Sequence, residues 1–123
     1  MTFVEKNLDH VALDYNDDWQ INEDGTCDVM ITGLEEFVYG FFGATESEVA
    51  EDGGWIDTYA VIDPKTDSII EIIFHATNVT EEEYRELDLK ITNEAEGKML
   101  LNKIRDNGGE FDNFYAECKE EVA

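Results

Sequence analysis

The side chains most able to do chemistry in this chain are the acidic residues of positions 14–28, DYNDDWQINEDGTCD. If a calcium-binding EF-hand loop began at Asp14, then Asn16 and Asp18 would occupy its third and fifth positions. That loop also needs a glycine at its sixth position and a glutamate at its twelfth, where this chain has Trp19 and Gly25. The segment therefore lacks the pattern of this metal loop, and we expect no metal and no cofactor.

Residues that could serve in nucleophilic or acid–base catalysis are few and scattered. The serines, Ser47 and Ser68, do not lie in a nucleophile-elbow sequence, and no glycine-rich phosphate loop is present. His10 and His75 each lack a partner at metal-ligand spacing. Paired carboxylates are uninformative where so many residues are acidic, and we expect that the chain is not an enzyme.

The two cysteines bear on the cellular compartment. Cys27 and Cys118 lie 91 positions apart, with no CxxC pattern and no cluster with histidine. The first ten residues, MTFVEKNLDH, have no basic segment followed by an apolar one, and no stretch is long and apolar enough for a membrane span. These features predict a cytoplasmic protein whose two thiols are reduced and buried.

Net charge is the strongest feature of the sequence. Asp and Glu number 31 against 8 Lys and Arg, so the formal net charge is −23. Positions 7–64 contain 15 carboxylates and no Lys or Arg. Hydrophobic residues nevertheless make up 42% of the chain, which is typical of a folded domain and not of an acidic disordered tail. We therefore expect a single acidic domain over residues 1–123.

The first element that positions these carboxylates is a predicted β-hairpin. Apolar residues alternate with polar ones over positions 11–21, with an interruption at Asp17 where a bulge or tight turn would fit. The turn sequence NEDG follows, and the alternation resumes over 27–31. This register directs Trp19 and Ile21 toward the core and directs Asp14, Asp18 and Asp28 toward solvent.

A second β-hairpin is predicted over 55–77, with its turn at DPKTD. Both of its faces contain apolar residues, so we expect it to be central in the sheet or covered on its second side. One face is predicted to carry Ile56, Thr58, Ala60, Ile62, Ile70, Ile72 and Phe74, and the other Trp55, Asp57, Tyr59, Val61, Ile69, Glu71, Ile73 and His75.

Capping boxes predict two short helices, one from Thr32 and Glu35 over 34–41 and one from Thr80 and Glu83. Alternation over 87–91 favours a fifth strand, although a continuous helix over 80–106 is an alternative. A helix over 93–107 with Met99, Leu100 and Ile104 inward follows, and a final amphipathic helix ends the chain, with Phe111, Phe114, Tyr115, Cys118 and Val122 on its apolar side. The fold class is thus α+β, an antiparallel sheet of two hairpins plus a fifth strand with short helices packed on it.

The acidity can be explained by salt adaptation or by a basic partner. Lys outnumbers Arg six to two, and we see no composition that favours salt adaptation. A globule of this length is roughly 35 Å across, and duplex DNA of that length carries about 20 phosphates, close to the charge of this chain. Charge density therefore favours a surface made for a basic partner.

Small size, extreme acidity, an α+β pattern and the absence of a catalytic motif resemble the acidic inhibitor proteins of phages and mobile elements. These include DNA mimics that block restriction enzymes and anti-CRISPR proteins that occupy the nucleic-acid cleft of CRISPR effector nucleases. The resemblance covers composition and size along the whole chain and includes no family motif. It implies an inhibitor in the bacterial cytoplasm that binds a basic nucleic-acid-binding protein, such as a CRISPR effector or a restriction enzyme, and binds neither nucleic acid nor a membrane.

We expect the partner-binding residues to lie on the two hairpins and on the acidic loop between them. The candidates are Asp14, Asp17, Asp18, Glu23, Asp24, Asp28, Glu46, Glu48, Glu51, Asp52, Asp57 and Tyr59. Two alternatives remain open at this point. One is an immunity protein that neutralises a bacterial nuclease toxin, and the other is a small acidic domain that binds a cation or another ligand.

Overall fold

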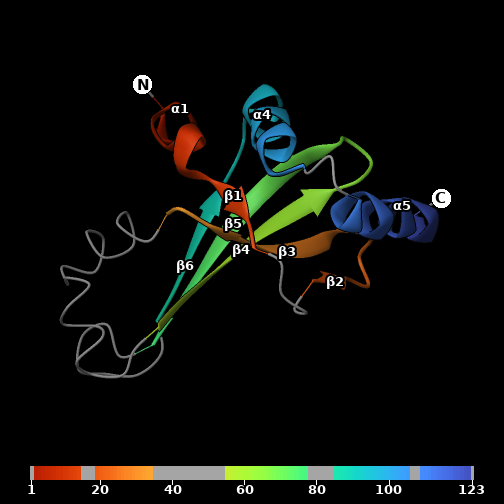
Figure 1. The fold of residues 1–123 in the computed structure, drawn as a ribbon, viewed down its shortest axis with the longest axis horizontal. Coiled ribbons are helices and arrows are strands. Elements are labelled where there is room, and N and C mark those ends of the chain that lie inside the picture. Colours follow the sequence, from red (N-terminus) through yellow and green to blue (C-terminus); the bar gives the residue numbers. More distant parts are fainter. Residues whose placement is uncertain (1, 15–18, 35–54, 78–84, 106–108, 123) are drawn as a thin grey trace.

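The computed structural model describes residues 2–14, 19–34, 55–77, 85–105 and 109–122. In this part of the chain, helices pack against an antiparallel six-stranded sheet, which confirms the α+β class (Figure 1). The strand order is β1-β3-β4-β5-β6, with β2 also paired to β3. The elements in chain order are α1 (Phe3–Asn7), the 3-10 turn η1 (Leu8–His10), β1 (Ala12–Leu13), β2 (Gln20–Ile21), β3 (Cys27–Thr32), β4 (Trp55–Asp63), β5 (Ser68–Thr77), β6 (Arg85–Lys90), α4 (Glu94–Ile104) and α5 (Glu110–Val122).

The first hairpin is present, but its leading strand is divided into two pieces. β1 pairs with the end of β3 and β2 pairs with its start, both antiparallel. The division falls where the sequence alternation is interrupted, and Asp17 itself lies outside the described residues. The turn between β2 and β3 closes when the Asn22 amide N–H donates to the Thr26 carbonyl at 2.8 Å. Gly25 supplies the positive φ of 91° that this turn requires.

The second hairpin forms the centre of the sheet, as its two partly apolar faces predicted. β4 and β5 pair along their length, and β3 and β6 flank them. One assignment is wrong, because the register shifts between Val61 and Ile62. Ile62 lies opposite Ile69 and Val61 opposite Glu71, so Ile70 is the extra residue of a β-bulge. Ile69 is therefore the buried residue, at 1% exposure, and Ile70 is only half-buried.

β6 confirms the fifth predicted strand and excludes a continuous helix over 80–106. After it, the Asn93 side chain caps α4 by accepting from the Glu96 amide N–H at 3.2 Å. Met99 was expected to face inward, but it is 42% exposed. The buried positions of α4 are Gly97, Leu100, Leu101 and Ile104, which recur at the i, i+3, i+4, i+7 spacing of one helix face, and Met99 lies on the opposite side.

α5 forms as predicted, with Phe111, Tyr115 and Cys118 buried and Phe114 half-buried. Two groups of contacts attach α5 to the rest of the chain. At the start of α5, Trp19 packs edge-on against Phe111 with ring centroids 6.2 Å apart, and against Phe114 with centroids 5.5 Å apart. At the other end, the Tyr115 hydroxyl donates to the Asp67 carboxylate at 2.7 Å, and the Lys119 ammonium group lies 2.9 Å from the same oxygen. Asp67 belongs to the turn between β4 and β5, so α5 is tied to both hairpins.

The sequence patterns missed α1, although Thr2 and Glu5 stand at the spacing of a capping box. The Thr2 hydroxyl accepts from the Glu5 amide N–H at 3.2 Å and so begins this helix. The two short helices predicted over 34–41 and from Thr80 lie outside the described residues, and Thr32 is the last residue of β3. In the described part of the chain, every helix is too short or too polar to cross a lipid bilayer.

Candidate interaction surface

The two faces of the sheet have different compositions. Alternate residues of a strand point to opposite faces, and residues opposite each other in antiparallel strands share a face. On the core face, Val29, Ala60 and Ile72 lie side by side on neighbouring strands and are fully buried. This face packs against α1, α4 and α5 through one hydrophobic cluster. The opposite face, which we call the outer face, carries the carboxylates.

The cross-strand register arranges the outer face in rows. The residues are Gln20, Asp28, Val61, Glu71 and Lys90 in one row, Asp14, Met30, Tyr59, Ile73 and Asp88 in the next, and Asp57 with His75 in the third. Asp14 joins its row because its amide N–H donates to the Met30 carbonyl at 2.9 Å. The rings of Tyr59 and His75 are in contact, with centroids 5.3 Å apart. An apolar and aromatic centre is thus surrounded by acidic side chains.

The outer face has a strong excess of negative charge. Among its described side chains, Asp14, Asp28, Asp57, Glu71 and Asp88 are acidic and Lys90 is basic. Lys90 forms an ion pair with Glu71, which raises the pKa of its ammonium group. Most of the other Lys and Arg residues of the described chain belong to the helices or to the segment just after α4, namely Lys6, Lys98, Lys103, Arg105 and Lys119. The same helices also carry eight carboxylates, so the helical side is acidic but mixed in charge, whereas the described outer face combines five carboxylates with a single cation.

Asp28 is the most firmly positioned carboxylate of this surface. The Asn22 amide donates to one of its oxygens at 3.0 Å, and the Gln20 amide donates to the other at 3.2 Å. Both donors are neutral, so the carboxylate keeps its negative charge while its orientation is fixed. Gln20 and Asn22 were not among the predicted site residues, because a role as supporting donors becomes visible only when β2 and β3 are paired.

Asp24 and Glu23 lie apart from the outer face, at the tip of the hairpin between β2 and β3. The Asp24 carboxylate accepts from the Thr26 hydroxyl at 2.6 Å and from the Thr26 amide N–H at 3.0 Å. These hydrogen bonds lower the pKa of Asp24. Asp24 therefore stabilises its own turn, and Glu23 beside it is exposed.

The structure thus brings together part of the predicted set. Asp14, Asp28, Asp57 and Tyr59 share the outer face, and Asp17, Asp18, Glu46, Glu48, Glu51 and Asp52 lie outside the described residues. Sequence reasoning missed Glu71 and Asp88, which lie in neighbouring rows of the same face. Alternation within the second hairpin predicted Glu71 on the same face as Tyr59, whereas Asp88 is placed there only by the pairing of β6 with β5.

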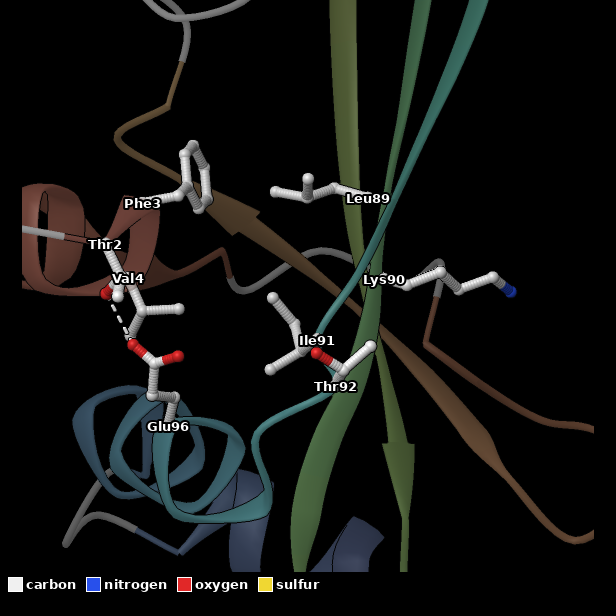
Figure 2. Close-up of a pocket in the computed structure, with 8 residues that line it drawn as sticks. All are labelled: Thr2, Phe3, Val4, Leu89, Lys90, Ile91, Thr92 and Glu96. Carbon is white, nitrogen blue, oxygen red and sulfur yellow. Dashed lines mark hydrogen bonds between the residues drawn. The ribbon is translucent and has the colours of Figure 1, made fainter.

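Two hollows lie elsewhere in the described chain. One, with room for about 100 Å³, lies between α1, β6 and the start of α4. Figure 2 shows Phe3 facing Leu89 across it, and Lys90 pointing away. Glu96 reaches into this hollow and accepts a hydrogen bond from the Thr2 hydroxyl. A second hollow, beside the turn between β4 and β5, contains Asp63 and Glu94 but neither His nor Cys.

Among the described residues, no group of three or more His, Cys, Asp or Glu side chains is placed to hold a metal ion. Comparisons with protein-family models, with curated proteins and with solved structures returned no match for this chain.

Proposed function

We propose that this chain is an inhibitor that binds a basic nucleic-acid-binding protein through the outer face of its sheet. The observation that supports the proposal is the composition of the described outer face, where five carboxylates and a single cation, Lys90, surround an apolar and aromatic centre at Tyr59. A surface of this kind attracts Lys and Arg side chains over a long range and orients the two proteins before contact. The partner would be a defence nuclease, with a CRISPR effector as the leading candidate.

The arrangement of the outer face suits competition with a nucleic acid. Asp14 lies diagonally from Asp28, and Glu71 lies diagonally from Asp88, on neighbouring strands. Diagonal neighbours in a sheet are about 7 Å apart, so these carboxylates offer acceptors to several basic side chains at once. CRISPR effectors hold the guide–target duplex in a positively charged channel and read a short DNA motif with arginines. Carboxylates seated on those arginines and lysines would exclude DNA without any chemical step, so the inhibition would be steric and reversible.

The test is a competition experiment with purified proteins. DNA binding by a guide-loaded CRISPR effector, by a restriction enzyme and by a bacterial nuclease toxin would be followed by fluorescence anisotropy, with and without this chain, at about 50 mM and about 200 mM salt. We expect one of the nucleases to lose DNA binding, more strongly at the lower salt because screening weakens the attraction. The proposal fails if none does. Selective inhibition of the toxin would instead identify an immunity protein.

Two charge-reversal double variants test whether inhibition depends on the outer face or only on the net charge of the protein. Asp57→Lys with Asp88→Lys reverses two charges of the outer face, and Glu117→Lys with Glu120→Lys reverses two exposed charges of α5. Both pairs change the net charge by the same amount. We expect the first pair to weaken inhibition by roughly tenfold or more and the second pair to have a much smaller effect. Equal effects would show that net charge acts without a defined surface.

A further inference from the structure

The two cysteines meet in the core, although they are 91 positions apart in the sequence. Cys27 comes from β3 and Cys118 from α5, and both are fully buried. Both side chains lie in the same buried hydrophobic cluster, and burial and, to a lesser extent, the Cys118 thiol raise the pKa of the Cys27 thiol. Neither cysteine is part of a disulfide, so β3 and α5 bring two free thiols into the same part of the core, away from the outer face.

We propose that Cys27 and Cys118 form a redox-modification site, at which a small disulfide oxidant converts the two thiols to a disulfide linking β3 to α5. One cysteine, as its thiolate, attacks a sulfur of the oxidant RSSR, forms a mixed disulfide and releases one RSH. The second cysteine then attacks the protein sulfur of that mixed disulfide and releases the other RSH. Two electrons pass from the protein thiols to the oxidant, and the two thiol protons end on the released RSH molecules. This modification is independent of the proposed inhibitory function.

The reaction is slow in the closed fold, because the thiols are protected in two ways. Burial raises the pKa of both thiols, so that the reactive thiolate is scarce. Neither sulfur is accessible to an oxidant while α5 is in place. Oxidation therefore requires α5 to separate locally from β3, and its rate follows the fraction of molecules in which α5 is open.

The contacts of Asp67 control this opening. Its carboxylate accepts hydrogen bonds from Tyr115 and Lys119, which lie on α5 on either side of Cys118. Loss of these contacts would weaken the attachment of α5, which would then depend on its buried side chains and on the packing of Phe111 and Phe114 against Trp19. Once formed, the disulfide would close a loop that includes most of the chain, and a loop of that length restricts the unfolded state strongly.

The experiment incubates the full chain with oxidised glutathione and follows it by mass spectrometry. We expect a product that has lost two hydrogens and carries no glutathione, with a melting temperature raised by roughly 10 °C and restored by dithiothreitol. The matched controls are Cys27→Ser and Cys118→Ser, which can form only the glutathione adduct. A wild-type chain that accumulates only such adducts, or that stays unmodified in denaturant concentrations that open α5, overturns the proposal.

A second variant tests whether α5 opening sets the rate. Asn tolerates the left-handed backbone found at Asp67, where φ is 53°, so Asp67→Asn removes the charge without backbone strain. We expect this variant to oxidise roughly tenfold faster than the wild type, because its α5 opens more often. Glu120→Gln, at an exposed position of α5, is the control and should oxidise at the wild-type rate. An unchanged rate in Asp67→Asn contradicts gating by α5.

Discussion

At the scale of single residues, the Asp67 carboxylate stabilises the fold and is not part of the acidic outer face. One of its oxygens accepts from both Tyr115 and Lys119, and the cations of Arg105 and Lys119 lie 5.4 and 5.0 Å from the centre of the Tyr115 ring. The hydrogen bonds from Lys119 and Tyr115 lower the pKa of Asp67. The pKa of the Tyr115 hydroxyl is raised, mainly because the hydroxyl is buried and secondly because it donates to Asp67.

The lowered pKa of Asp67 predicts a specific dependence of stability on pH. Because the folded-state pKa lies below the unfolded value of 3.8, the contribution is fully present above that value and is lost as the pH falls through the folded pKa. Asp67→Asn should reduce the free energy of unfolding by about 1 kcal/mol at neutral pH, a modest value because the carboxylate is half exposed and screened. Chemical denaturation of both proteins from neutral pH to about pH 3 measures the difference, which should shrink as the pH falls below 3.8.

Tyr115→Phe provides the control for this prediction. It removes the same hydrogen bond but keeps the ring and its packing, so its effect and that of Asp67→Asn should be less than additive in the double variant. A difference between Asp67→Asn and wild type that stays constant over the whole pH range would contradict the assigned role. Comparison within this set of variants is necessary because protonation of other carboxylates relieves repulsion in all of these proteins alike.

At the scale of elements, α4 packs unusually closely on β5. Gly97 lies on the buried face of α4, and a Cβ atom at this position would be 2.4 Å from the Ile69 carbonyl oxygen and 3.1 Å from the Ser68 Cβ. The nearest obstacle is backbone, which cannot rotate away as a side chain can. Gly97 therefore sets the distance between the helix and the strand.

Gly97→Ala should destabilise the protein even though alanine is the better helix former. The added methyl group forces α4 away from β5, and we expect the free energy of unfolding to fall by about 2 kcal/mol, as is typical of overpacking. Urea denaturation measures the change. Lys98→Ala, at the next and exposed position, is the matched control and should change stability by less than about 0.5 kcal/mol. A stabilised Gly97→Ala protein would show that the helix propensity, about 1 kcal/mol, outweighs the close contact.

The helices and strands also show which features of the fold sequence patterns can predict. The two β-rich runs on either side of the DPKTD turn located β4 and β5, and alternation located β6. It could not locate the β-bulge at Ile70, since a row of isoleucines reads the same in either register. Met99 was misassigned for a related reason. A methionine beside two leucines fits an apolar stripe, and only the packing of α4 on β5 decides which side of the helix is buried.

The outer face was predictable only in part. Asp14, Asp28 and Asp57 follow from alternation within two hairpins, since a carboxylate between apolar residues points away from the core. Glu71 was predicted on the same face as Tyr59 but not as a site residue, and the approach of Asp88 to Tyr59 depends on the pairing of β6 with β5. Local pattern gives the direction of a side chain but not its neighbours on other strands.

At the scale of the whole molecule, the dominant feature is a net charge of −23 on a single small chain. Charges of one sign repel more strongly in the folded protein than in the expanded unfolded chain, so the repulsion lowers stability. Salt screens it, because the Debye length falls from about 30 Å at 0.01 M to about 8 Å at physiological ionic strength. The stability of the protein should therefore depend on salt far more than its few ion pairs suggest.

We expect the melting temperature at neutral pH to rise with sodium chloride over this range of concentration, by several degrees. Differential scanning calorimetry measures the shift. The same series near pH 4.1, the isoelectric point, is the control, and there the effect should be much smaller because the net charge is close to zero. A melting temperature that is insensitive to salt at neutral pH would mean that the carboxylates are arranged so that their repulsion is already offset.

The packing of Trp19 against α5 also has a consequence for folding during protein synthesis. The strands β3, β4, β5 and β6 pair in chain order, so each can add to the sheet soon after it leaves the ribosome. Trp19 and Cys27 cannot complete their burial until α5, the last helix of this sequence, has been made. Until α5 has been synthesised, the nascent chain therefore exposes an apolar strip of its first hairpin, to which chaperones that recognise hydrophobic segments can bind.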